Sequence, residues 1–122
     1  MICCAVGTGG TITGLIESSH PHQKILGFSA LKGDFLTAEV AAKTAKQNWS
    51  ITDRFSCGGY AKTNSALLKF MQDFEARYAI PLEQVYTAKM MMGVFQWIDE
   101  GYFPANARIL LIHSGGLQGR HA

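Results

Sequence analysis

The stretch ICCAV at residues 2–6 is a continuous apolar run, and it leads directly into GTGGT at residues 7–11. A short apolar run that ends at a glycine is typical of a strand buried on both faces. Residues 12–18 follow the glycines and are predicted to form a short helix. The beginning of the chain therefore indicates a strand, a glycine turn and a helix in immediate succession.

The same alternation continues along the chain. Apolar runs predict strands at residues 25–29 and 109–113, the latter being the clearest buried strand, and a weaker strand at 51–56. Capping residues and apolar faces predict three further helices. The first covers 35–46 and follows Asp34 as its cap. The second is capped by Asn64 or Thr63 and has an apolar face made of Leu67, Phe70, Met71, Phe74 and Tyr78. The third ends at Gly101 and has an apolar face made of Met91, Val94, Phe95 and Ile98. This order predicts an α/β fold with a parallel sheet, in which ligands bind beyond the carboxyl ends of the strands.

Length and composition predict one small packed domain. The 122 residues are 48% hydrophobic and 16% charged, and the net charge is +2. No long basic run points to nucleic acid, and no apolar run is long enough to span a membrane. Two of the three cysteines are adjacent, Cys3 and Cys4, and no positively charged leader precedes them. Reduced thiols in a cytoplasmic protein are therefore expected.

The glycine turn is the strongest candidate for a binding site. Glycines allow a positive φ and a close approach of the backbone to an anion, and the N–H groups of the following helix point toward that anion. A phosphate is the natural ligand. Ile12 stands where a dinucleotide loop needs glycine, and Leu15 stands where a P-loop needs lysine. An ordinary strand-to-helix turn remains the alternative interpretation.

Other candidate residues are weaker. His20 and His22 lack a neighbouring carboxylate or thiol at a metal-site spacing, so we expect a solvated loop and no metal. Lys62 and Lys89 could form a Schiff base if they were desolvated, but we expect both lysines to lie at the surface.

Four stretches together resemble a known family: GTGGT at 7–11, GGYAK at 58–62, VYTAKMM at 85–91 and HSGGLQG at 113–119. In this order they resemble the C-terminal part of the 1-aminocyclopropane-1-carboxylate deaminase and D-cysteine desulfhydrase family, pyridoxal-phosphate enzymes of the tryptophan-synthase-β fold type. The resemblance covers essentially all of the chain. It implies that residues 1–122 are a single partial domain, with a partial parallel sheet flanked by helices, as in the C-terminal portion of the large domain of fold-type II enzymes.

The resemblance also implies roles for particular residues. Tyr60 and Tyr86 match active-site tyrosines near the substrate and the pyridoxal ring, and they are the predicted catalytic residues. The resemblance also implies two sets of contacts to pyridoxal 5'-phosphate. The loop would hold the phosphate through Gly7, Thr8, Gly9, Gly10 and Thr11. The hydroxyl groups of Thr87 and Ser114 would lie near the ring nitrogen. Deaminases proper carry glutamate where Thr87 stands, so threonine resembles the desulfhydrase branch.

In the family, the Schiff-base lysine lies far upstream of the glycine loop. We therefore expect this chain to be the C-terminal portion of a deaminase or lyase that acts on a small amino acid, and to be inactive alone. A missing N-terminal half or self-association would complete it. The alternative is a non-catalytic α/β module for anion binding or oligomerisation. A third interpretation is an enzyme rebuilt around Lys62 or Lys89. The substrate is left open.

Overall fold

The computed structural model describes residues 1–7 and 9–113. Its elements in chain order are β1 (Ile2–Val6), α1 (Gly10–Ser18), β2 (Ile25–Ser29), α2 (Phe35–Ala41), β3 (Trp49–Thr52), α3 (Ser65–Tyr78), α4 (Thr87–Asp99) and β4 (Leu110–Leu111). The four strands form one parallel sheet in the order β3-β2-β1-β4. The predicted α/β fold, a partial parallel sheet flanked by helices, is confirmed. Within the described ranges, no helix has the length and apolar character needed to cross a membrane.

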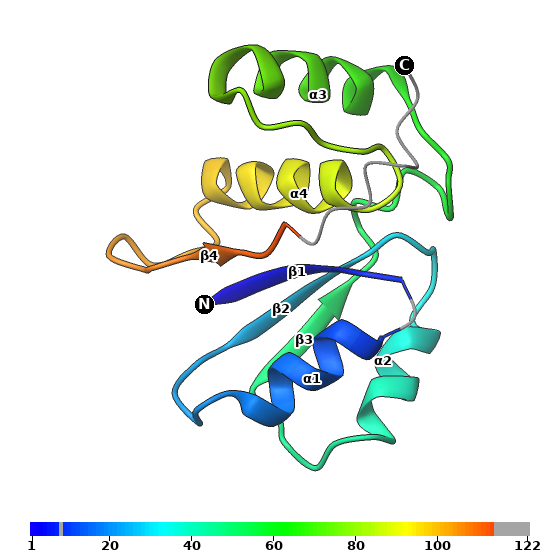
Figure 1. The fold of residues 1–122 in the computed structure, drawn as a ribbon. Coiled ribbons are helices and arrows are strands. Elements are labelled where there is room, and N and C mark those ends of the chain that lie inside the picture. The colour runs from blue at the N-terminus through cyan, green and yellow to red at the C-terminus, as the bar shows by residue number, and fades with distance from the viewer. Residues whose placement is uncertain (8, 114–122) are drawn as a thin grey trace.

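Helices cover the sheet from both sides. Helices α1 and α2 lie on one face, and α3 and α4 lie beyond the other, with α4 next to the strands (Figure 1). Successive residues of a strand point to opposite faces, so the adjacent thiols of β1 enter different cores. Cys3 packs in the core under α4, and Cys4 packs in the core under α1 and α2. Burial raises the pKa of Cys3 to about 11 and that of Cys4 to about 12.

Local capping explains where two helices begin and end. The side chain of Asn64 accepts a hydrogen bond from the Leu67 N–H at 2.8 Å, so Asn64 caps α3.

Helix α2 ends at Ala41, five residues before the predicted end. The chain turns away there and brings the Lys46 ammonium to three carbonyls at the end of α1, those of Ile16, Glu17 and Ser19, at 2.9 to 3.1 Å.

The last predicted strand is shorter and more exposed than expected. Residues 109–113 were predicted to be buried, but β4 comprises two residues and Leu110 is 56% exposed. The reason is its place at the edge of the sheet, where β1 is its neighbour among the described strands. Strand β3, the opposite edge, lies at Trp49–Thr52 and not at 51–56. Ile98 is also exposed, because the buried part of α4 ends at Val94.

Gly93 allows α4 to approach the sheet closely. A Cβ atom at Gly93 would lie 2.7 Å from a ring carbon of Phe55 and 2.8 Å from ring carbons of Phe28, and both rings are buried. We expect Gly93→Ala to lower the free energy of unfolding by about 1–3 kcal/mol through overpacking. Gly14 of α1 has no atom within 4 Å of the same position, so Gly14→Ala should stabilise by about 0.5–1 kcal/mol. Urea denaturation of both variants tests this difference, and equal effects would contradict it.

Candidate functional site

The turn after β1 forms the predicted anion-binding geometry. Gly9 has a φ of 89°, a conformation that favours glycine, and α1 begins at the next residue. The hydroxyl of Thr13 donates to the Gly9 carbonyl at 2.6 Å and holds the turn against the helix. Among the described residues, no side chain caps α1 at this end. The first N–H groups of the helix therefore face outward with partial positive charge.

A small hollow of about 40 Å³ lies in this turn. Its lining comes from the end of β1, the turn and the first residues of α1: Ala5, Val6, Gly7, Gly9, Gly10, Thr11 and Ile12. Four of the five predicted loop residues thus line one concave site, and Thr8 lies outside the described residues. The site sits at the carboxyl end of a central strand, where the fold class predicts ligand binding.

Tyr86 lies directly against the glycine turn. A Cβ atom at Gly7 would lie 2.7 Å from Cε1 and 3.2 Å from the hydroxyl oxygen of Tyr86. The phenol ring therefore occupies the space that a side chain at position 7 would need. Gly7 is required for this close approach, and Tyr86 forms one wall beside the candidate anion site.

Tyr60 completes the group. Its ring centroid lies 6.2 Å from that of Tyr86, with an interplanar angle of 65°. A side-chain hydrogen bond with Tyr60, together with burial, raises the pKa of Tyr86 to about 12. Tyr60 itself is 56% exposed. The structure thus brings both predicted catalytic tyrosines together, and Tyr86 places the pair beside the glycine turn.

Glu83 fixes the backbone of Tyr86, and sequence reasoning missed it. Its carboxylate is buried and accepts the backbone N–H groups of Val85, Tyr86 and Thr87 at 2.6, 2.7 and 2.6 Å. This side chain therefore caps α4. The signal available in the sequence was an acidic residue four positions before Thr87. Thr87 is buried, and its hydroxyl accepts the Glu83 N–H at 3.0 Å, which places it in this cap.

Lys89 is not at the surface, so that expectation was wrong. The side chain is 1% exposed, and its Nζ donates to the Gly59 carbonyl at 3.0 Å. Burial lowers the pKa of Lys89, while Cys57 and Glu83 act in the opposite direction. Lys89 lies in the first turns of α4, which are buried on every side. Lys62, by contrast, is exposed. Ser114 lies outside the described residues.

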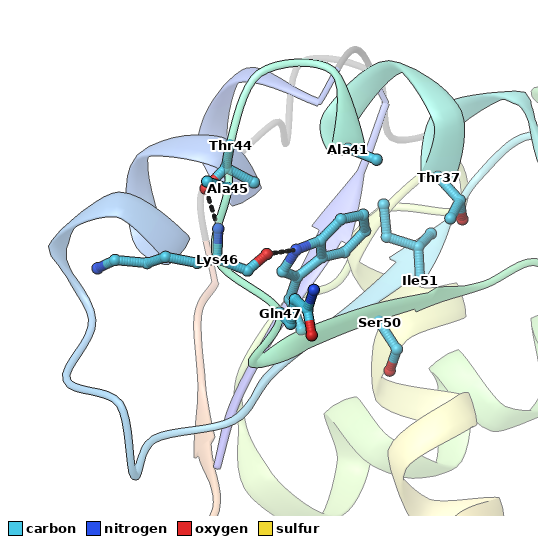
Figure 2. A pocket seen from close by; sticks show the side chains of 9 residues that line it. Thr37, Ala41, Thr44, Ala45, Lys46, Gln47, Ser50 and Ile51 are labelled. Carbon is cyan, nitrogen blue, oxygen red and sulfur yellow. Dashed lines mark hydrogen bonds between the residues drawn. The ribbon is translucent and has the colours of Figure 1, made fainter.

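A second hollow lies elsewhere, between α2 and β3. It measures about 450 Å³ and is lined by Thr37, Ala41, Thr44, Ala45, Lys46, Gln47, Trp49, Ser50 and Ile51 (Figure 2). The Lys46 side chain extends away from the hollow, and the indole of Trp49 donates to the Lys46 carbonyl at 2.8 Å (Figure 2). None of the predicted site residues lines this hollow.

Comparisons with known proteins point to one family, although no family model matches the chain. The chain is 25% identical to a 1-aminocyclopropane-1-carboxylate deaminase of Cyberlindnera saturnus, covering 95% of this chain and 38% of that protein. It is 27% identical to a putative deaminase of the same name from Thermotoga maritima, covering 99% and 42%. It is 28% identical to a D-cysteine desulfhydrase of Klebsiella pneumoniae, covering 94% and 39%.

A solved structure shows the same fold. The crystal structure of an ACC deaminase homologue superposes with a TM-score of 0.76 at 24% identity, over 97% of this chain and 40% of that chain. The chain thus spans about two fifths of the length of the proteins it matches. The predicted resemblance is confirmed: the chain is similar to the C-terminal part of the 1-aminocyclopropane-1-carboxylate deaminase and D-cysteine desulfhydrase family.

Proposed function

We propose that this chain is the C-terminal portion of a pyridoxal-phosphate-dependent amino-acid deaminase or lyase of the deaminase and D-cysteine desulfhydrase class. The observation that supports this most is the meeting of the glycine turn, Tyr86 and Tyr60 at the end of β1. These residues come from separate stretches of the sequence, and each stretch belongs to the resemblance. A substrate that is a small amino acid follows from the same resemblance.

The residues present fit the cofactor. Its phosphate is an anion, and the N–H groups at Gly10 and Thr11 open a helix beside a hollow that Gly7, Gly9 and Gly10 help to line. The Tyr86 ring lies against the same turn, at Gly7, where it would flank a bound ring. When bound, pyridoxal phosphate supplies an electron sink for the carbanion of an amino acid.

The two tyrosines would handle protons. A pKa of about 12 keeps the Tyr86 phenol protonated at neutral pH, so its hydroxyl is a donor. Tyr60 is hydrogen-bonded to Tyr86 and is exposed, so a substrate could reach its hydroxyl. Thr87 and Ser114 are proposed as neutral hydroxyl partners of the ring nitrogen, and the bond from Glu83 holds the Thr87 hydroxyl in place.

We propose that the amine that binds the cofactor covalently comes from outside this chain, from a missing N-terminal half. Lys89 already donates to Gly59 in the interior, and Lys62 is exposed. The two edges of the sheet, β3 and β4, leave room for further chain. The chain alone should therefore be inactive. A cytoplasmic location, which the free cysteines fit, belongs to this proposal.

The glycine turn provides the test of cofactor binding. Gly9→Ala would force a side chain into a φ of 89° and place its Cβ 3.2 Å from Val40, which should displace the N–H groups of the turn. We expect pyridoxal phosphate to bind at least about 10-fold more weakly, the loss of one bond to an anion. Titration followed by phosphorus NMR measures the affinity.

Gly33→Ala is the matched control, because Gly33 has a φ of 106° but lies outside the turn. It should leave the affinity unchanged. Equal binding by wild type and Gly9→Ala would contradict the phosphate site. Inorganic phosphate binding as tightly as pyridoxal phosphate, with no turnover after addition of an N-terminal half, would favour the non-catalytic anion-binding module. Borohydride trapping on Lys62 or Lys89 with turnover would favour the rebuilt enzyme.

A further inference from the structure

The segment that carries Tyr60 has an unusual backbone. Over residues 57–61, four residues have a positive φ: Cys57 at 57°, Gly58 at 95°, Gly59 at 140° and Ala61 at 56°. Two of them carry a Cβ atom, and such residues cost on the order of 1 kcal/mol each in this conformation. A segment with this conformation keeps its shape only if its surroundings hold it.

Local backbone hydrogen bonds join Gly59 to Ser56 at 3.2 Å and to Lys62 at 3.1 Å, and Lys89 adds a contact from the interior. Its Nζ donates to the Gly59 carbonyl at 3.0 Å, and both residues are buried. Gly59 is the direct neighbour of Tyr60 in the chain. An ammonium group is costly to bury unless it is paired and hydrogen-bonded. A methionine of similar shape would avoid this cost but could not donate a hydrogen bond to Gly59.

Helix α4 therefore reaches the segment at two points. Tyr86, the residue before the helix, contacts the ring of Tyr60, and Lys89, three positions later, binds the carbonyl before Tyr60. Residues three apart lie on the same side of a helix. The groups that face Lys89 electrostatically are Cys57, on the held segment, and Glu83, which caps the same helix.

We propose that Lys89 is a positioning residue, which holds residues 57–61 through the Gly59 carbonyl so that Tyr60 stays against Tyr86 beside the glycine turn. Its value for catalysis rests on the proposed function. The positioning itself does not depend on that function, because it concerns two tyrosine rings of this chain alone.

The test compares two lysines of the same neighbourhood in the full chain. Lys89→Met removes the donor at nearly constant shape, and Lys62→Met changes an exposed lysine next to the same segment. With tyrosines labelled on the ring, NMR should show a Tyr60–Tyr86 Overhauser contact in the wild type and in Lys62→Met. Lys89→Met should lose this contact, and its Tyr86 should titrate at least about one pH unit lower, toward the ordinary value for tyrosine. Lys89→Arg retains a donor and should keep the contact.

A folded Lys89→Met that keeps both the contact and the Tyr86 titration overturns the proposal, because a merely structural lysine would change only stability. Should Lys89→Met not fold, nitrogen-15-labelled lysine in the wild type decides. One Nζ signal with slowly exchanging protons and a scalar coupling to the Gly59 carbonyl carbon supports the proposal, and fast exchange at every lysine overturns it. Failure of pyridoxal phosphate to bind would overturn the proposed function and leave these ring measurements valid.

Discussion

Replacing Glu83 with alanine is expected to lower the free energy of unfolding by about 4 kcal/mol, the largest loss for any single side chain at the site. The carboxylate is 1% exposed and accepts three backbone N–H groups at the start of α4. Its removal leaves one buried donor, the Thr87 N–H, and two part-buried donors unpaired. Bonds to a charged acceptor are worth about 1.5–3 kcal/mol each, and water can replace part of that at the two part-buried N–H groups. Urea denaturation followed by tryptophan fluorescence measures the loss.

Glu83→Gln separates shape from charge. The amide keeps one accepting oxygen but turns an NH₂ toward a backbone N–H, so we expect a loss of about 2 kcal/mol. Glu39→Gln, on the exposed side of α2, is the matched control and should change stability little. A Glu83→Gln variant as stable as Glu39→Gln would show that the cap contributes little, and that Tyr86 is held by packing alone.

Alkaline pH should destabilise the fold steeply through the two thiols of β1. The folded pKa values of Cys3 and Cys4, about 11 and about 12, lie above the ordinary value of 9.0. The unfolded chain therefore releases protons that the folded chain keeps. The stabilisation is complete below pH 9 and is lost progressively as the pH rises from 9 through 11 and 12. By pH 11 the loss is about 5 kcal/mol, roughly 2 from Cys3 and roughly 3 from Cys4, since each unit corresponds to about 1.4 kcal/mol.

The double variant Cys3→Ala, Cys4→Ala isolates this effect. Other groups also titrate in the region: the raised pKa of Tyr86 adds to the loss above pH 10, and the lowered pKa of Lys89 acts with the opposite sign. The difference between the wild-type and double-variant stability curves removes both contributions. The variant should be less stable at pH 7 and should lose less stability between pH 8 and 11. Parallel curves would show that the thiols ionise in the folded state at their ordinary pKa.

The strands of the sheet's centre could be predicted closely, and its edges could not. Residues 2–6 and 25–29 were predicted as strands at the bounds that the structure shows, because helices cover both faces of these strands and their residues are therefore nearly all apolar. Residues 109–113 have the same apolar pattern, yet Leu110 is exposed. The order of strands in a sheet depends on contacts between distant segments, and an apolar run carries no information about it.

The candidate site, too, could be predicted only in part from the sequence. The glycine turn, Tyr60 and Tyr86 could be predicted as one group because each belongs to a stretch that resembles the family. Lys89 was predicted at the surface because lysine is rarely buried without a partner, and its partner is a main-chain carbonyl that no side-chain pattern reveals. Glu83 was missed for the same reason, since the partners of its carboxylate are backbone N–H groups.

The pairing of β1 with β4 sets the order of events while the chain is being made. The amino group of Met1 donates to the carbonyl of Arg108, 107 positions away, and β4 is the second neighbour of β1. At a synthesis rate of about 5–20 residues per second, β4 is made roughly 5–20 s after β1, and this edge of β1 stays unpaired with β4 until then. During that interval a central, apolar strand has an open edge, which invites pairing with other chains. This edge of β1 is therefore most open to mispairing during translation, before β4 pairs with it.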